Sequence, residues 1–156
     1  MSKPNRGSEV VILFPVSEKE ETQKEIGHVD IDGGTEDILI IDDEIMILHM
    51  TRDILEESGY TVRTALSGRE GIEMAEKRMP DLVILDLRMP EMDGRHVLKR
   101  LIEIDPNVRI LMASGYVEEK QKKEILDMGV YGFLQKPFSA DDLKKYVRNI
   151  FNTPHP

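Results

Sequence analysis

The 156-residue chain contains no cysteine, and aromatic residues make up only 5% of it. Without cysteine there is no disulfide framework, no thiolate metal site and no cysteine nucleophile. Basic residues are also scarce: 21 lysines and arginines face 30 aspartates and glutamates, a formal net charge of −9. Nucleic acids and anionic membranes need a basic patch that displaces their counterions. We therefore expect no nucleic-acid partner.

Long apolar runs are missing as well. Apolar stretches such as Val10–Val16 (VVILFPV) and Ile38–Ile41 (ILII) are far shorter than the roughly 18 residues that a membrane span requires. No basic segment followed by an apolar stretch stands at the N-terminus, so no signal peptide is visible. We expect no direct membrane insertion and a cytoplasmic location.

From Glu36 onward, short apolar runs alternate with amphipathic stretches, a pattern typical of parallel strands joined by crossover helices. The strands are expected at Ile38–Ile41, Tyr60–Thr64, Leu82–Leu85, Val108–Met112 and Tyr131–Leu134. Three of these runs are almost wholly apolar, as expected for central strands covered on both faces. The pattern predicts an α/β domain with a five-stranded, doubly wound (βα)5 parallel sheet.

The stretches between the strands carry signals for the ends of helices. N-terminal caps are predicted at Ser67, with Glu70 three residues on, and at Ser139, with Asp142. Gly59 and Gly129 stand where helices should end, because glycine adopts the left-handed conformation at little cost. The last helix shows an apolar stripe of Leu143, Val147, Ile150 and Phe151.

Residues 1–35 do not follow this alternation. The charged run Glu18–Glu25 and the glycine-containing segment Asp30–Thr35 are typical of a solvated linker. We therefore expect an N-terminal tail and linker at 1–35 and one domain at 36–152.

Polar side chains follow four of the predicted strands, where ligands bind in open parallel sheets. They are Asp42, Asp43 and Glu44 after the first strand, Asp86 after the third, Ser114 after the fourth, and Lys136 and Pro137 after the fifth. Any one alone is more simply a helix cap or a surface charge. Because polar residues follow four strands at the same edge of the sheet, together they indicate a ligand-binding or catalytic site.

The chemistry of these groups points to phosphoryl transfer. Converging carboxylates repel one another unless a cation neutralises them, and Mg²⁺ is a hard ion that prefers oxygen ligands. A lysine can balance phosphoryl charge and a serine hydroxyl can bind a phosphoryl oxygen. Asp86, the lone acid at the predicted central strand, is the best nucleophile.

Four motifs in order, ILIIDDE, LVILDLRMPEMDG, ILMASGY and FLQKPF, make residues 37–152 resemble a response-regulator receiver domain of two-component signalling. The resemblance implies a flavodoxin-like fold with strand order 2-1-3-4-5. It also implies a phosphoacceptor signalling domain whose own chemistry is limited to self-phosphorylation and self-dephosphorylation. The phosphodonor would be a histidine kinase or a histidine phosphotransfer domain.

The resemblance further assigns a role to each site residue. It implies Asp86 as the phosphoacceptor, and Asp42, Asp43, Asp86 and the Arg88 backbone carbonyl as ligands of Mg²⁺. Ser114 and Lys136 would bind the phosphoryl group, and Phe133 would be the aromatic side chain that turns with Ser114 on switching. Met89, Pro90 and Gly94 would shape the loop after Asp86, Gly115 would leave room for the donor, and the Lys136–Pro137 bond would be cis.

The resemblance also implies that two bulky residues lie at the positions that, in the receiver family, control the access of water to the phosphoryl group. These are Arg88 and Tyr116, two residues past Asp86 and Ser114. Neither is suited to activating a water as a base, so a long-lived phosphorylated state is predicted.

Weaker features concern the wider protein. The sequence MASGY resembles receivers of hybrid sensor kinases, and residues 7–18 resemble the closing strand of a histidine-kinase ATP-binding domain. The hypothesis is a C-terminal receiver of a hybrid kinase; the alternative for 7–18 is a disordered tail. A homodimer through the face of the fourth helix, fifth strand and fifth helix is also considered.

Two alternative functions fit the sequence less well. A haloacid-dehalogenase-type phosphatase needs a second aspartate two residues after the nucleophile, where this chain has Arg88. A degenerate receiver that serves as a dimerisation module would not need the complete set of site residues present here. His49 and His96 have no second ligand four residues on and are interpreted as surface or packing residues.

Overall fold

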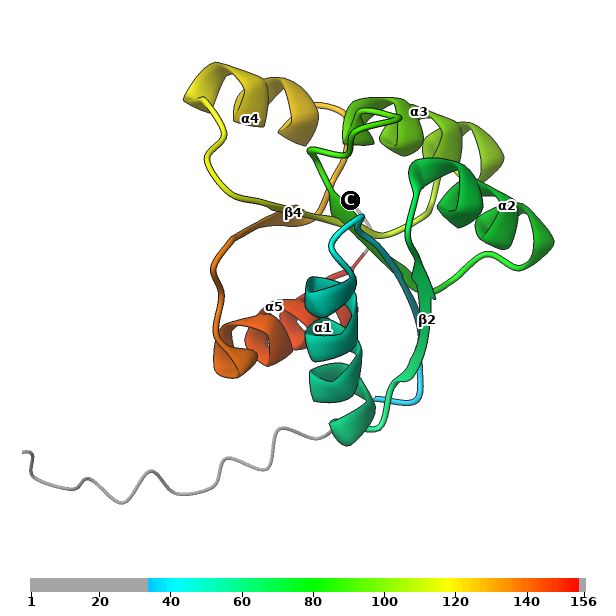
Figure 1. The fold of residues 1–156 in the computed structure, drawn as a ribbon, viewed down its shortest axis with the longest axis vertical. Coiled ribbons are helices and arrows are strands. Elements are labelled where there is room, and N and C mark those ends of the chain that lie inside the picture. The colour runs from blue at the N-terminus through cyan, green and yellow to red at the C-terminus, as the bar shows by residue number, and fades with distance from the viewer. Residues whose placement is uncertain (1–33, 155–156) are drawn as a thin grey trace, which may run out of the picture. The chain divides into compact units, whose positions relative to one another are not determined.

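The computed structural model describes residues 34–154, in which five strands and five helices alternate (Figure 1). The strands are β1 (Asp37–Ile41), β2 (Thr61–Ala65), β3 (Leu82–Asp86), β4 (Ile110–Ser114) and β5 (Gly132–Gln135). The helices are α1 (Ile45–Glu57), α2 (Gly68–Lys77), α3 (Gly94–Ile104), α4 (Glu119–Leu126) and α5 (Ala140–Asn152). Residues 1–33 of the predicted tail and linker, which include the segment 7–18, lie outside the described residues.

The strands form one parallel sheet in the order β2-β1-β3-β4-β5, which confirms the predicted fold class. In its register Ile41 lies beside Leu85, and Leu85 beside Met112. The carboxyl ends of the three central strands therefore stop at nearly the same level, and the residues that follow them meet at one edge.

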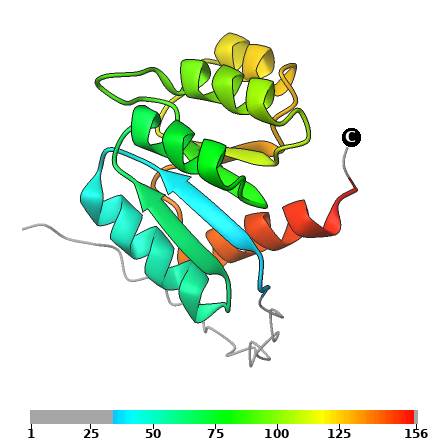
Figure 2. The same cartoon turned by 90° about the vertical axis from the view of Figure 1, so that its right-hand side faces the viewer.

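Helices cover both faces of the sheet (Figures 1 and 2). Ile38 and Ile40 pack in one core with Leu55 of α1 and Leu143 of α5. The alternate β1 side chains face a second core formed with α2, α3 and α4. Every residue of β1, β3 and β4 is buried. No helix in the stretch from residue 34 to 154 is both long and apolar enough to span a membrane.

The start of β2 shows how a helix end shifts a strand boundary. Gly59 has φ +89°, and its N–H donates to the Glu56 carbonyl at 2.9 Å. The Tyr60 N–H donates to the Leu55 carbonyl at 3.2 Å, so both bonds of a Schellman motif close α1. Tyr60 therefore belongs to the helix end, and β2 begins one residue later than predicted, at Thr61.

The predicted caps are confirmed. The Ser67 Oγ accepts a hydrogen bond from the Glu70 N–H at 3.2 Å. Ser139 and Asp142 form a reciprocal capping box at the start of α5. These caps satisfy N–H groups that would otherwise have no partner in the first turn of each helix.

A buried ion pair lies at the amino end of β1, opposite the edge where Asp42 follows. Asp37, 5% exposed, accepts hydrogen bonds from the Arg63 guanidinium at 3.0 and 2.7 Å. The Asp37 N–H donates to Asp81 Oδ2 at 2.8 Å. Two neighbouring strands are thereby fastened by a bidentate arginine–carboxylate pair.

Candidate functional site

Three carboxylates converge at the carboxyl edge of the sheet. Asp42 and Asp43 directly follow β1, and Asp86 is the last residue of β3. One oxygen from each lies within 4.8 Å of the others. Asp42 and Asp86 are 2% and 5% exposed, whereas Asp43 is open to solvent. The Asp42 N–H donates to the Ala65 carbonyl at 3.1 Å, so the sheet's hydrogen bonding continues into the cluster.

Lys136 supplies a positive charge to this cluster from the end of β5. Its Nζ lies 2.6 Å from Asp42 Oδ2 and 3.2 Å from Asp86 Oδ1. The Lys136 N–H donates to the Ser114 carbonyl at 2.7 Å, and the peptide bond to Pro137 is cis, as predicted. The lysine thus reaches both buried acids from a backbone fixed to β4.

Glu44 also reaches the lysine, a contact that was not predicted for it. Its Oε1 lies 3.6 Å from the Lys136 Nζ, although its side chain is 63% exposed. The three consecutive acids after β1 were the available signal. Because α1 starts at Ile45, Glu44 is the residue that turns the chain from the site into the helix.

The electrostatics of the cluster separate Asp86 from its neighbours. Burial raises the pKa of Asp86, the charge of Lys136 partly offsets this, and the charges of Asp42 and Asp43 raise it further, to about 6. Burial by itself lowers the pKa of Lys136, but the bond to Asp42 and the charges of Asp42 and Asp86 outweigh it, so this pKa lies above its usual value. The lysine stays protonated, and the charged form of Asp86 is disfavoured by its surroundings.

Ser114, the last residue of β4, is 2% exposed, and its buried Oγ has no hydrogen-bond partner among residues 34–154. Buried hydroxyl groups are normally paired, and an unpaired one marks a position where a partner is missing. A Cβ added to the next residue, Gly115, would meet nothing within 4 Å. The hydroxyl therefore lies beside an open approach to the site.

The start of α3 packs closely against the backbone of Asp86 and of the loop after β3. A Cβ on Gly94 would lie 2.4 Å from the Asp86 carbonyl oxygen and 2.8 Å from the Leu87 Cα. The Leu87 N–H donates to the Ala113 carbonyl at 3.2 Å. Only glycine leaves room for so close an approach of the loop and the start of α3.

Arg88 extends from this loop to the loop after β4. Its Nη2 donates to the Tyr116 carbonyl at 2.8 Å, whereas the Tyr116 side chain is 74% exposed. Arg88 also lines an open groove with Asp43 and Pro90. Within residues 34–154 the guanidinium thus bonds to a backbone carbonyl and forms no ion pair with an acid, and the Tyr116 side chain is open to solvent.

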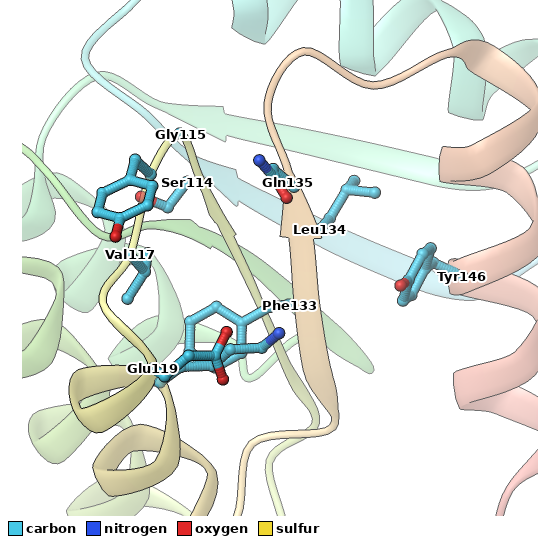
Figure 3. A pocket seen from close by; sticks show the side chains of 10 residues that line it. Ser114, Gly115, Val117, Glu119, Phe133, Leu134, Gln135 and Tyr146 are labelled. Atoms are coloured by element: carbon cyan, nitrogen blue, oxygen red, sulfur yellow. The ribbon is translucent and has the colours of Figure 1, made fainter.

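A cavity of about 270 Å³ opens between β4, β5, α4 and α5 (Figure 3). Ser114 and Gly115 line one side of it, and Phe133 of β5 lines another. Figure 3 shows the Phe133 ring directed toward Glu119 at the start of α4. Ser114 and Phe133 therefore share one space.

The donor set suits a hard divalent cation. Carboxylate oxygens from two strand ends meet at one point, which one cation, Lys136, only partly neutralises. Mg²⁺ typically binds through one or two carboxylates plus phosphate oxygens and waters. The carboxylate oxygens of Asp42, Asp43 and Asp86 are therefore ligands of the kind that Mg²⁺ prefers.

A five-stranded sheet in this order, with acids, a serine and a lysine at its carboxyl edge, defines a receiver of two-component signalling. The family model for the response regulator receiver domain matches residues 38–148, and the chain belongs to this family. It is a signalling domain of the phosphoacceptor class. The phosphatase alternative is not supported by the family match.

Similar proteins include single-domain and multidomain members of the family. Sporulation initiation phosphotransferase F of Bacillus subtilis is 34% identical over 113 residues, which cover 72% of this chain and 91% of that protein. Sensor kinase CckA of Brucella abortus is 34% identical over 119 residues, 75% of this chain but 13% of the kinase. The crystal structure of chemotaxis protein CheY4 of Vibrio cholerae has a TM-score of 0.71 and 32% identity, over 75% of this chain and 99% of CheY4.

Proposed function

We propose that Asp86 is the phosphoacceptor and that it takes a phosphoryl group from a phosphohistidine. The observation that carries this proposal is the convergence of the Asp42, Asp43 and Asp86 oxygens within 4.8 Å, with the Lys136 Nζ 3.2 Å from Asp86. Phosphoryl transfer depends chiefly on positioning and on neutralising charge. This edge of the sheet combines a buried nucleophile with a fixed cation.

In the proposed step a carboxylate oxygen of Asp86 attacks phosphorus. An oxygen–phosphorus bond forms, the nitrogen–phosphorus bond of the donor breaks, and its electron pair stays on the imidazole. Lys136 balances the phosphoryl charge, and the Ser114 hydroxyl donates to a phosphoryl oxygen. Mg²⁺, held by Asp42, Asp43, Asp86 and the Arg88 carbonyl, would supply the additional positive charge that lets two anions meet.

The surroundings of the site favour a protein as donor, either a histidine kinase or a histidine phosphotransfer domain. Directly after the acids, α1 exposes the apolar side chains of Ile45 and Met46, 52% and 75% exposed. Exposed apolar groups beside a reactive centre suit contact with another protein surface. A small anionic phosphodonor would bind through the charged groups of the site alone and would not need these apolar side chains.

The cavity that Ser114 shares with Phe133 indicates which surface would change on phosphorylation. Closure of Ser114 onto a phosphoryl oxygen would move the loop after β4, and Phe133 would turn into the space between them. The face formed by α4, β5 and α5 would then change shape, which makes it the proposed partner and homodimer surface.

We further infer that this receiver is the C-terminal part of a hybrid sensor kinase in the cytoplasm. The similarity to a short part of sensor kinase CckA supports this inference. A kinase ATP-binding domain encoded in frame upstream of residue 1 would establish it. A stop codon directly upstream would contradict it.

The test of Asp86 is intact-mass measurement after incubation with acetyl phosphate and Mg²⁺. Wild type should gain the mass of one phosphoryl group, and Asp86→Asn or addition of EDTA should abolish the gain. Asp141→Asn, which changes an exposed aspartate of α5, is the matched control and should label like wild type. Labelling of Asp86→Asn at the wild-type level would show that the phosphoacceptor lies elsewhere. Absence of labelling in wild type would favour a dimerisation module.

A further inference from the structure

The side chain of Lys122 lies against the aromatic ring of Phe133. From α4, its Nζ lies 5.9 Å from the ring centroid. An ammonium group within about 6 Å of a ring centroid is attracted to the face of the ring. Lys122 makes no ion pair within residues 34–154, so its charge is not shared with a carboxylate there.

The space next to Phe133 does not prevent the ring from turning. The cavity that it shares with Ser114 measures about 270 Å³ (Figure 3). A cavity of about 150 Å³ is large enough to hold benzene. Phe133 also packs against the buried core that includes Met112 and Ile125. Because room for the ring toward Ser114 is already present, the attraction of Lys122 adds to this packing and favours the orientation toward α4.

We propose that Lys122 is a positioning residue that restrains Phe133, so that its positive charge sets how often the ring turns toward Ser114. The inference rests on the proposed function, in which the turned ring belongs to the phosphorylated state. By linkage, anything that favours the turned ring also favours phosphorylation. Loss of the charge on Lys122, by substitution or by acylation of the amine, would therefore bias the domain toward its switched form.

The expected size of this effect is modest. A partly exposed cation–π contact contributes about 0.5–1 kcal/mol. At about 1.4 kcal/mol per tenfold change in an equilibrium constant, its loss should raise the population of the turned ring about two- to fivefold.

The test compares Lys122→Met, which keeps the length of the side chain, with Lys122→Arg, which keeps the charge. Nuclear Overhauser effects between the Phe133 ring and the Ser114 β-protons report the turned ring in the unphosphorylated, metal-free protein. They should rise about two- to fivefold in Lys122→Met and stay at the wild-type level in Lys122→Arg. Lys123→Met, an exposed neighbour on α4, should also match wild type.

A second measurement separates this inference from the proposed function. The initial rate of labelling by acetyl phosphate should rise in Lys122→Met and not in Lys122→Arg. If Asp86 is not the phosphoacceptor, the labelling changes lose their meaning but the Overhauser effects still test the restraint. Unchanged Overhauser effects in Lys122→Met, or an equal rise in Lys122→Arg, would overturn the role of Lys122.

Discussion

The surroundings of the Asp86 carboxylate disfavour its negative charge. It is almost completely buried, it lies near two further acids, and its pKa of about 6 reflects both. The charge of Lys136 reduces this cost, and the proposed Mg²⁺ would reduce it further. The charged form that the proposed phosphoryl transfer requires is therefore kept at the expense of stability.

Replacing Asp86 with asparagine should stabilise the metal-free protein at pH 7. The folded-state pKa of about 6 exceeds the ordinary value of 3.8, so the charged carboxylate destabilises the fold above pH 6. Each pKa unit corresponds to about 1.4 kcal/mol, and allowing for solvent screening we expect a gain of about 1–2 kcal/mol. Urea unfolding in EDTA measures it.

The pH dependence provides the check on this explanation. As the pH falls from 6 toward 4, the wild-type carboxyl becomes protonated in the folded state and the advantage of asparagine should disappear. Asp141→Asn should show no such trend. A gain that is constant from pH 4 to 7 would point to a cause other than charge.

The lifetime of the phosphorylated state depends on Arg88 and Tyr116 if they shield the phosphorus from water. In the resting structure Arg88 bonds to the Tyr116 carbonyl, which places both on one side of the site. Tyr116→Ala and Arg88→Asn should each speed the decay of loaded protein, about tenfold for every 1.4 kcal/mol of lost shielding. Decay is followed by mass after removal of the donor; equal rates in all three proteins would refute shielding.

At the scale of single elements, the sequence predicted the type and order of the strands but not every boundary. β4 begins at Ile110 and not at Val108, because the Val108 N–H donates to the Asp105 carbonyl in the preceding turn. The apolar pattern cannot show this, since Val108 is buried like a strand residue. Backbone hydrogen bonds, not hydropathy, set where the strand starts.

The sequence predicted the residues of the candidate site but not the contacts around them. Asp42, Asp86 and Lys136 could be assigned because parallel strands bring their carboxyl ends to one edge. The Lys122–Phe133 contact could not, because it depends on the position of α4 over β5, and lysine is common on exposed helix faces.

The junction of β3 and α3 gives a prediction about Gly94. Gly94→Ala should lower the free energy of unfolding by about 1–3 kcal/mol, a range typical of overpacking, because its Cβ would overlap the Asp86 carbonyl oxygen. Gly115→Ala is the matched control: its Cβ meets open space, so its stability should change by less than about 0.5 kcal/mol. Chemical denaturation measures both. Equal effects would mean that crowding against the Asp86 carbonyl does not decide the stability.

For the molecule as a whole, Mg²⁺ should act as a stabilising ligand. At a hundred times its dissociation constant, a ligand that binds only the folded state adds about 2.7 kcal/mol. Wild type should therefore melt several degrees higher in Mg²⁺ than in EDTA, and Asp42→Asn should lose most of this difference. An equal shift in Asp42→Asn would place the ion elsewhere. Differential scanning calorimetry supplies the measurement.

The carboxylates near the two ends of β1 differ in how their negative charge is balanced. At the amino end, Asp37 is matched by Arg63, a partner that belongs to the chain and does not dissociate. Beyond the carboxyl end, Asp42 and Asp86 share one lysine, and the proposed Mg²⁺ would supply the rest of the balancing charge. The counter-charge at the amino end is thus wholly part of the chain, whereas part of the counter-charge at the other end would be exchangeable. The concentration of the divalent cation in solution would then alter the proposed site while the Asp37–Arg63 pair stays unchanged.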